Sequence, residues 1–308
     1  MPSSMVSAFN KQYPQIKIHQ VAGDLSGDVQ AAGQVIQNQS SYDMAFLTVA
    51  SVGQAAQAGV LEKPDFSKLP NITNVAAQFR SAYPWGFPTD NGNIGYAYRK
   101  DLISERPTTW REFWQLIPKY SGKVVLAQYD RDVISSSLLG LGYDANSTSP
   151  AEIKAATKQV INAKPHLLQF AETNIAKPLA QGAAVLTLDW NTDVAAFVSS
   201  NKNIVWVNPR EGMTSFLEGW VPVKGTSKLA EVETIMNFFM EPKHYAIYVN
   251  PIPCFGTIPA VKPYLLPAVR TNRALIPPPS SVKLYFESYL GEAATKMWDE
   301  AWQEIQSA

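Results

Sequence analysis

Two periodicities of hydrophobic and polar positions run along this chain. Short apolar or alternating segments predict strands, and longer segments with apolar residues three or four positions apart predict helices. The strands expected are Ile16–Val21, Tyr42–Leu47, Lys123–Ala127, Gly182–Trp190 and Ile204–Val207. The helices expected are Ser4–Lys11, Asp28–Gln37, Val52–Ala58, a helix after the cap Thr109, a helix that follows a turn at Gln128–Asp132 and runs through Leu139, Pro150–Asn162, Val194–Val198, Ala230–Met240, Ser281–Tyr289 and Ala293–Gln306.

Strands that alternate with helices over short connections predict an α/β fold. Each lobe is expected to hold a mixed, mostly parallel sheet flanked by helices. Ligands of such sheets bind at the carboxyl ends of the strands. Thr48 directly follows the strand Tyr42–Leu47 and is therefore a candidate ligand-binding residue.

Two stretches far apart in the sequence are predicted to be extended, Tyr83–Ile103 and Phe216–Val223. The first contains the turn-prone Asp90-Asn91-Gly92, so we expect one strand to enter a turn there and another to leave it. Two crossings of this kind are typical of a chain that passes from one lobe to another and back, with a ligand cleft between the lobes and hinges near Asn93 and Leu217. The expected lobes are residues 1–93 with 218–262, and residues 94–217 with 263–308.

Composition adds limits to this picture. The 308 residues are 46% hydrophobic, which is enough for about two domains with cores of their own. Twenty-six basic residues balance 26 acidic ones, so no global field favours nucleic acid, and charge selectivity has to be local. No stretch approaches the roughly 18 to 20 apolar residues that a membrane span needs.

Residues typical of enzymes are scattered. The three histidines, His19, His166 and His244, are not at metal-ligand spacing, and the GxSxG, P-loop and GxGxxG motifs do not occur. Cys254 is the single cysteine and lies in a predicted turn. We therefore expect no catalytic residues, no metal ligands and no cofactor.

Acidic and aromatic residues occur together at three places and predict a cation site. The pairs are Tyr129 with Asp132, Asp189 with Trp190, and Phe216 with Glu218. Binding an ammonium group away from water requires charge-assisted hydrogen bonds, each about 1.5 to 3 kcal/mol, together with aromatic faces worth about 0.5 to 2 kcal/mol. Each pair can supply one wall of such a site.

The order of several segments resembles that of the polyamine-type solute-binding proteins of ABC importers. The resemblance extends from about Tyr13 to the end of the chain and is carried by WGFPTDNGNIGYAYRKDL, TTWREFWQLIPKYSGKVVLAQYDRDV, LGYDANSTSPAEI, LDWNTDVAAFV and VWVNPREGMTSFLEGWVPV. It implies a two-lobed periplasmic-binding-protein fold that binds a small cationic amine and delivers it to a membrane permease. It also implies a monomer in the periplasm or another extracytoplasmic compartment.

The resemblance also implies roles for individual residues. Trp190 matches the family's stacking tryptophan, Glu218 and Asp132 match acids that bind amines, and Thr48 can replace a hydroxyl donor. Phe216 stands where the family has a tryptophan, and Ser288 falls near an amide-bearing contact. Two departures are Tyr129, where the family has a carboxylate, and Ala50, where it has a tyrosine. One carboxylate fewer favours putrescine or another small amine over spermidine.

The start of the sequence differs from the family pattern. Family members are exported, yet no basic segment followed by an apolar core precedes Met5–Tyr13, and the family's first strand, which carries aromatic ligand contacts, is missing. We therefore expect a truncated chain whose export signal was removed or lost.

Two other functional classes stay open at this point. The same fold could bind an anion or a metal ion, with Arg131 and Arg210 as the available anion-binding residues. An enzyme on a related two-lobed scaffold would need Cys254 or a histidine to face the cleft beside a carboxylate.

Overall fold

The computed structural model describes residues 1–21, 28–251 and 254–308. The chain forms two compact units. Unit 1 comprises Met1–Asn91 and Phe216–Arg270, and unit 2 comprises Gly92–Ser215 and Thr271–Ala308. The two longest strands, β2 (Phe87–Arg99) and β7 (Met213–Pro222), each contain one of the points at which the chain passes from one unit to the other.

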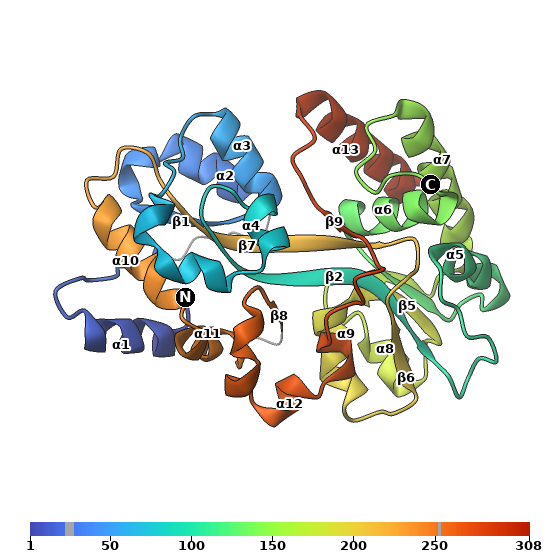
Figure 1. Cartoon of the computed structure of the whole chain (residues 1–308). Helices are drawn as coiled ribbons and strands as arrows, with labels where there is room; N and C mark the ends of the chain where they lie inside the picture. Colours follow the sequence, from blue (N-terminus) through green and yellow to red (C-terminus); the bar gives the residue numbers. More distant parts are fainter. Residues whose placement is uncertain (22–27, 252–253) are drawn as a thin grey trace. The chain divides into compact units, whose positions relative to one another are not determined.

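Unit 1 contains an α/β layer and a helical cluster. Helices α2 and α3 pack on each other and on β1 (Figure 1). Phe9 of α1 packs edge-on against Phe238 of α10. Helix α11 contacts both α1 and α10. The elements are α1 (Ser3–Gln12), α2 (Asp28–Gln37), η1 (Gln39–Ser41), β1 (Met44–Thr48), α3 (Val49–Gln57), η2 (Phe66–Lys68), η3 (Pro70–Asn74), α4 (Ala77–Ala82), α10 (Leu229–Phe239), α11 (Pro242–Val249), β8 (Phe255–Gly256), η5 (Pro259–Tyr264) and α12 (Pro267–Arg270).

Unit 2 is a sheet with helices on both faces. Strands β4, β3 and β5 are parallel neighbours, and β5 pairs antiparallel with β2, which also pairs with β6. Figure 1 shows α5, α6, α7 and α13 on one side of this sheet and α8 and α9 on the other. The elements are α5 (Trp110–Lys119), β3 (Val124–Ala127), α6 (Asp130–Leu141), α7 (Pro150–Ala163), η4 (Lys164–His166), β4 (Gln169–Ala171), α8 (Lys177–Gln181), β5 (Leu186–Trp190), α9 (Asn191–Val198), β6 (Ile204–Val207), η6 (Arg273–Leu275), β9 (Leu284–Phe286) and α13 (Glu292–Ser307).

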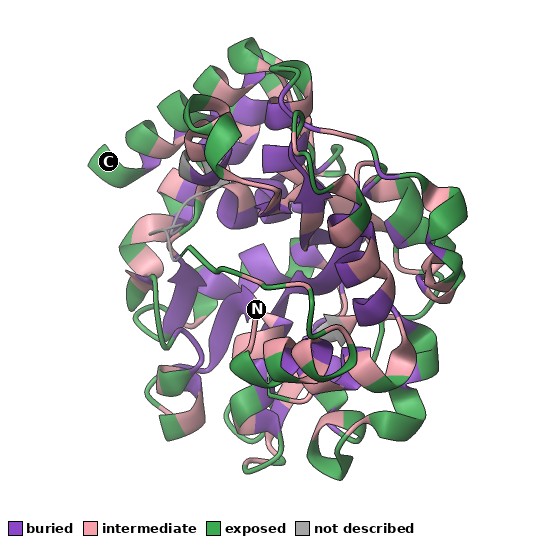
Figure 2. Cartoon of the chain, turned by 90° about the vertical axis from the view of Figure 1, so that its left-hand side faces the viewer, coloured by how far each residue is buried: buried purple, intermediate pink, exposed green. Residues whose placement is uncertain are grey.

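The predicted cap Thr109 at the start of α5 is confirmed, and it forms a capping box with Glu112. The Thr109 side chain accepts a hydrogen bond from Glu112 N, and the Glu112 carboxylate accepts one from Thr109 N. Trp110, Phe113 and Trp114 are buried on one face of the helix, as expected for core residues. Strands β2, β3 and β5 are almost completely buried, and the outward helix faces are exposed (Figure 2).

The α/β class is confirmed, but the expectation of a mostly parallel sheet is wrong for the described pairs of unit 1. There β1 pairs antiparallel with β7, and β2 pairs antiparallel with β8. The reason is the order of the strands along the chain. The partners of β1 and β2 are β7 and β8, which come after the chain has returned from unit 2. They do not belong to a strand–helix–strand repeat, which would give parallel neighbours.

Three local predictions are wrong. Asp90-Asn91-Gly92 forms no turn, since Asp90 and Asn91 pair with Gly256 and Phe255 inside the continuous strand β2. The segment Ser281–Tyr289 contains the strand β9 instead of a helix, because β7 offers it a parallel partner. Ile16–Val21 is not a strand, and within the described ranges it has no ladder partner.

Among the residues that the structure describes, no helix combines the length and the apolar character needed to cross a membrane.

Candidate cation-binding site

The carboxyl ends of two neighbouring strands of unit 2 bring Tyr129 and Trp190 together. Strands β3 and β5 are parallel, with Leu126 opposite Leu188, so both end at the same edge of the sheet. Tyr129 follows β3 and Trp190 is the last residue of β5. Their ring centroids are 4.8 Å apart, at an interplanar angle of 43°. The Tyr129 hydroxyl donates to the backbone oxygen of Glu172, beyond the next strand, β4.

Two buried carboxyl groups lie beside this aromatic pair. Asp189 precedes Trp190 in β5 and is completely buried, and Asp132 in the first turn of α6 is 4% exposed. Asp189 Oδ1 accepts a hydrogen bond from Trp190 N at 2.7 Å. In the described part of the chain, Oδ2 of Asp189 and Oδ2 of Asp132 have no hydrogen-bond partner. A buried polar atom without a partner is costly, so these two oxygens are suited to a donor that comes from outside the chain.

The electrostatic environment of both carboxyl groups is negative. Burial raises the pKa of Asp132 well above its ordinary value, and the charges of Glu287, Asp130 and Asp189 raise it further. Burial also raises the pKa of Asp189, with a smaller contribution from the charge of Asp193. A cation beside these groups would favour their ionised forms and lower both pKa values.

Arg131 is the basic residue next to Asp132 in the sequence. Its positive charge lowers the pKa of Asp132, but this effect is smaller than each of the effects that raise it. Its guanidinium group is bound elsewhere. One nitrogen donates to Asn146 Oδ1 at 2.5 Å, and the group lies 4.5 Å from the centre of the Trp298 ring. The negative charge at this edge of the sheet is therefore only weakly compensated.

In unit 1 the β1–β7 pairing sets Thr48 opposite Glu218. The Thr48 side chain caps α3 by accepting a hydrogen bond from Ser51 N at 3.2 Å. Phe216 lies two residues before Glu218 on β7, and since side chains alternate along a strand, the two residues share a face. Both are partly exposed, which leaves them accessible to a ligand.

The sequence analysis missed Asp90, a second acid of unit 1. It is 5% exposed, and its Oδ1 accepts hydrogen bonds from Tyr248 Oη at 2.8 Å and Thr89 Oγ1 at 2.6 Å. Burial raises the pKa of Asp90, whereas the two hydrogen bonds lower it. After burial, the charges of Asp90 and Glu218 raise the pKa of the Cys254 thiol. Asp90 was not predicted as a site residue because the turn propensity of Asp90-Asn91-Gly92 suggested an exposed loop.

The structure groups the predicted residues unit by unit. Unit 2 brings together Tyr129, Asp132, Asp189 and Trp190, and unit 1 brings together Thr48, Phe216 and Glu218.

The residues required by the alternative functions are placed less favourably. Arg131 binds Asn146 and Trp298, and Arg210 is exposed in a loop where its backbone N–H donates to Thr108 O. Cys254 is buried, and burial raises the pKa of its thiol, which opposes formation of the reactive thiolate. Within the described ranges, no group of three or more histidine, cysteine, aspartate or glutamate residues could hold a metal ion.

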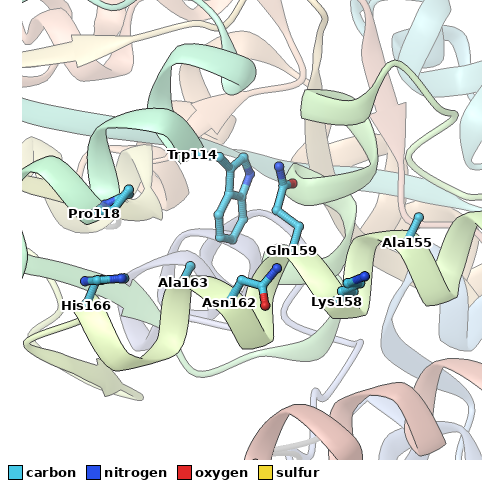
Figure 3. Close-up of a pocket in the computed structure, with 8 residues that line it drawn as sticks. All are labelled: Trp114, Pro118, Ala155, Lys158, Gln159, Asn162, Ala163 and His166. Atoms are coloured by element: carbon cyan, nitrogen blue, oxygen red, sulfur yellow. The ribbon is translucent and has the colours of Figure 1, made fainter.

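A separate hollow of about 350 Å³ lies between α5 and α7 of unit 2 (Figure 3). The indole of Trp114 points into the space between the helices, toward Gln159. The hollow contains basic side chains and none of its lining residues is acidic, so it is unsuited to a cation. It is lined by Trp114, Pro118, Ala155, Lys158, Gln159, Asn162, Ala163 and His166.

Comparison with solved structures identifies the fold. The spermidine/putrescine ABC transporter substrate-binding protein PotD from Streptococcus pneumoniae matches with a TM-score of 0.84 at 17% identity, over 100% of this chain and 95% of that one. The Tp0655 (TpPotD) lipoprotein of Treponema pallidum matches with a TM-score of 0.78 at 21% identity, over 99% and 95%. The predicted two-lobed periplasmic-binding-protein fold is confirmed.

Sequence relatives point the same way. The spermidine/putrescine-binding periplasmic protein of Escherichia coli is 26% identical over 281 residues, which cover 87% of this chain and 78% of the relative. The putrescine/cadaverine-binding protein of Pseudomonas aeruginosa is 22% identical over 300 residues, which cover 91% and 84%. The family described as bacterial extracellular solute-binding protein matches residues 4–277. The chain therefore belongs to the bacterial extracellular solute-binding protein family.

Proposed function

We propose that this protein captures a small cationic amine, such as putrescine or spermidine, outside the cytoplasm and delivers it to the permease of an ABC transporter. The observation that carries the proposal is a pair of buried oxygens, Asp132 Oδ2 and Asp189 Oδ2, which have no partner among the described residues and lie beside the adjacent rings of Tyr129 and Trp190. The names of the relatives in Escherichia coli and Pseudomonas aeruginosa support the same ligand class.

An ammonium group satisfies the chemistry of this edge of the sheet. It carries three N–H donors and a positive charge, so one group can bond two carboxylates at once and offset their repulsion. The faces of Tyr129 and Trp190 can accept the charge or cover the alkyl chain of the ligand. Glu218, Phe216 and Thr48 of unit 1 are the further proposed ligand-binding residues.

The remaining parts of the proposal follow from this role. The protein acts as a binding protein and not as an enzyme, it works as a monomer without a cofactor, and its partners are the amine and the permease rather than nucleic acid. The movement that accompanies binding would involve the strands β2 and β7, since these carry the chain from one unit to the other.

Titration calorimetry with putrescine, spermidine and anions of similar size, such as succinate, tests the proposal. We expect saturable binding of at least one amine and no heat from the anion beyond dilution. A clear preference for the anion would overturn the assignment of a cationic ligand.

A further inference from the structure

The hollow between α5 and α7 has a polar wall where a helix contact is normally apolar. Helix α7 and the turn η4 contribute residues that recur every three or four positions and therefore share one helix face. This face carries two amides and two basic side chains opposite Trp114 of α5 (Figure 3). Its members are Ala155, Lys158, Gln159, Asn162, Ala163 and His166.

Small side chains keep the hollow open. Ala155 and Ala163 of α7 and Pro118 of α5 are too short to fill the space between the two helices. The volume is about 350 Å³, near the lower end of the roughly 300 to 1,000 Å³ that is typical of small-molecule sites. It suits a ligand with the size of one ring and one polar group.

Trp114, whose ring lines the hollow, has an N–H group that lacks an acceptor. The side chain is 4% exposed, and among the described residues its Nε1 atom has no hydrogen-bond partner. The ring points toward Gln159 (Figure 3), whose Oε1 accepts a hydrogen bond from Ser137 Oγ at 2.7 Å. The other end of this amide is an NH₂ donor, which cannot satisfy a second donor. An acceptor from outside the chain would satisfy both groups.

Basic side chains determine which kind of acceptor the hollow favours. Lys158 contributes a positive charge, and none of the lining residues is acidic. His166 Nδ1 is hydrogen-bonded to Ser121 Oγ at 3.1 Å, which leaves its Nε2 atom for another partner. A negatively charged acceptor therefore fits this wall better than a neutral or a cationic one.

We propose that this hollow is a second binding site, which takes a small carboxylate with an apolar body. The apolar body lies against Pro118 and the two alanines, and the carboxylate accepts hydrogen bonds from Trp114 Nε1 and Gln159 Nε2, with Lys158 as its counter-charge. A carboxylate has two oxygens and can accept from several donors at once. The inference does not depend on the proposed function, because the hollow shares no residue with the candidate amine site.

Nuclear magnetic resonance of isotope-labelled protein tests the inference, with benzoate as the probe. The chain has eight tryptophans, and the indole N–H signal that disappears in Trp114→Phe belongs to Trp114. We expect benzoate to shift this signal saturably, with a dissociation constant of about 1 mM or below. Benzylamine has the same ring with a positive charge and should leave the signal unchanged. No saturable shift with benzoate up to about 10 mM, or an equal shift with benzylamine, would overturn the proposal.

Two lysines of α7 provide matched charge variants. Lys158 lines the hollow, whereas Lys154, about one turn earlier, is exposed and does not. Lys158→Gln should weaken benzoate binding about threefold or more, and Lys154→Gln should leave it within about 1.5-fold. Equal benzoate affinities of the two variants would overturn the assignment of a carboxylate to this hollow. Melting temperatures of both variants exclude a general loss of folding.

Putrescine separates this inference from the proposed function. The Trp114 signal should respond to benzoate equally well when putrescine is present in excess. Loss of the benzoate response under these conditions would show that the two ligands compete, and a separate site would be overturned. A protein that binds benzoate in this way and binds neither putrescine nor spermidine would overturn the proposed function and leave the hollow as a carboxylate site.

Discussion

Tyr129 and Trp190 lie with their ring centroids 4.8 Å apart although they are 61 positions apart in the chain, because they lie at the carboxyl ends of neighbouring parallel strands. Trp190→Ala should weaken amine binding by about 2- to 30-fold, the range expected for loss of one aromatic face to a cation. Titration calorimetry with putrescine measures the effect. Trp302→Ala is the control, since Trp302 of α13 packs on Phe170, 5.9 Å between ring centroids. Equal affinities of the Trp190 variant and the control would remove Trp190 from the site.

Asp132 should be a residue at which binding and stability oppose each other. Asp132→Asn keeps the size of the side chain and removes a charge that other acids surround. We expect weaker putrescine binding, by about tenfold or more, together with an unfolding free energy at pH 7 that is equal or higher. Chemical denaturation and calorimetry on the same preparation check both. A variant that loses stability and keeps its affinity would contradict this account.

The raised pKa values of Asp132 and Asp189 predict how the stability of the ligand-free protein depends on pH. The folded protein holds the two protons more tightly than the unfolded chain does. Their contribution to stability is therefore complete at low pH and is lost as the pH rises above about 4, the ordinary carboxyl pKa, toward the folded-state values.

The matching measurement is the unfolding free energy across that pH range, with and without putrescine. We expect the decrease to be smaller in Asp132→Asn than in the unaltered protein or in Glu304→Gln, which removes an exposed acid of α13. Putrescine affinity should change in the opposite direction and increase with pH, because the ammonium group binds the ionised carboxylates. Parallel pH profiles for all three proteins would show that Asp132 does not titrate as described.

Glu218 is the proposed acid of unit 1, opposite Thr48 in the β1–β7 ladder. Glu218→Gln should lower amine affinity at least about tenfold through loss of a charge-assisted interaction. The comparison with Glu304→Gln controls for net charge. Unchanged affinity in the Glu218 variant would confine the amine-binding acids to unit 2.

Two glycines provide a test of the fold itself. A Cβ added at Gly86 would lie 2.0 Å from the backbone oxygen of Trp220, whereas one added at Gly33 in α2 has nothing within 4 Å. Gly86→Ala should therefore reduce the unfolding free energy by about 1 to 3 kcal/mol or more. Gly33→Ala should raise it by about 0.5 to 1 kcal/mol through helix propensity. Equal stabilities in denaturant titrations would show that Gly86, directly before β2, does not lie as close to Trp220 of β7 as described.

Local patterns predicted the elements whose stability depends on their own residues. The capping box at Thr109 and the apolar periodicity after it defined α5, and the apolar segment before Tyr129 defined β3. The same local signals placed Tyr129 and Trp190 at the carboxyl ends of strands. The edge of the sheet that carries the aromatic pair could therefore be predicted.

Such local patterns do not predict which distant segments pair with each other. Asp90-Asn91-Gly92 has the composition of a turn and is a strand because β8 pairs with it, and Leu284–Phe286 is a strand because β7 does. Each error left the position of one acid in the fold unpredicted, Asp90 in the first case and Glu287 in the second. The burial of these two side chains and the charges around them can be predicted only when the partner strand is known.

A crystal structure of the protein with putrescine tests the central claim most directly. The account predicts one ammonium nitrogen within about 3 Å of carboxylate oxygens of Asp132 and Asp189, with the alkyl chain against the rings of Tyr129 and Trp190. Putrescine bound elsewhere, with the Oδ2 atoms of Asp132 and Asp189 still lacking a ligand donor, would contradict it.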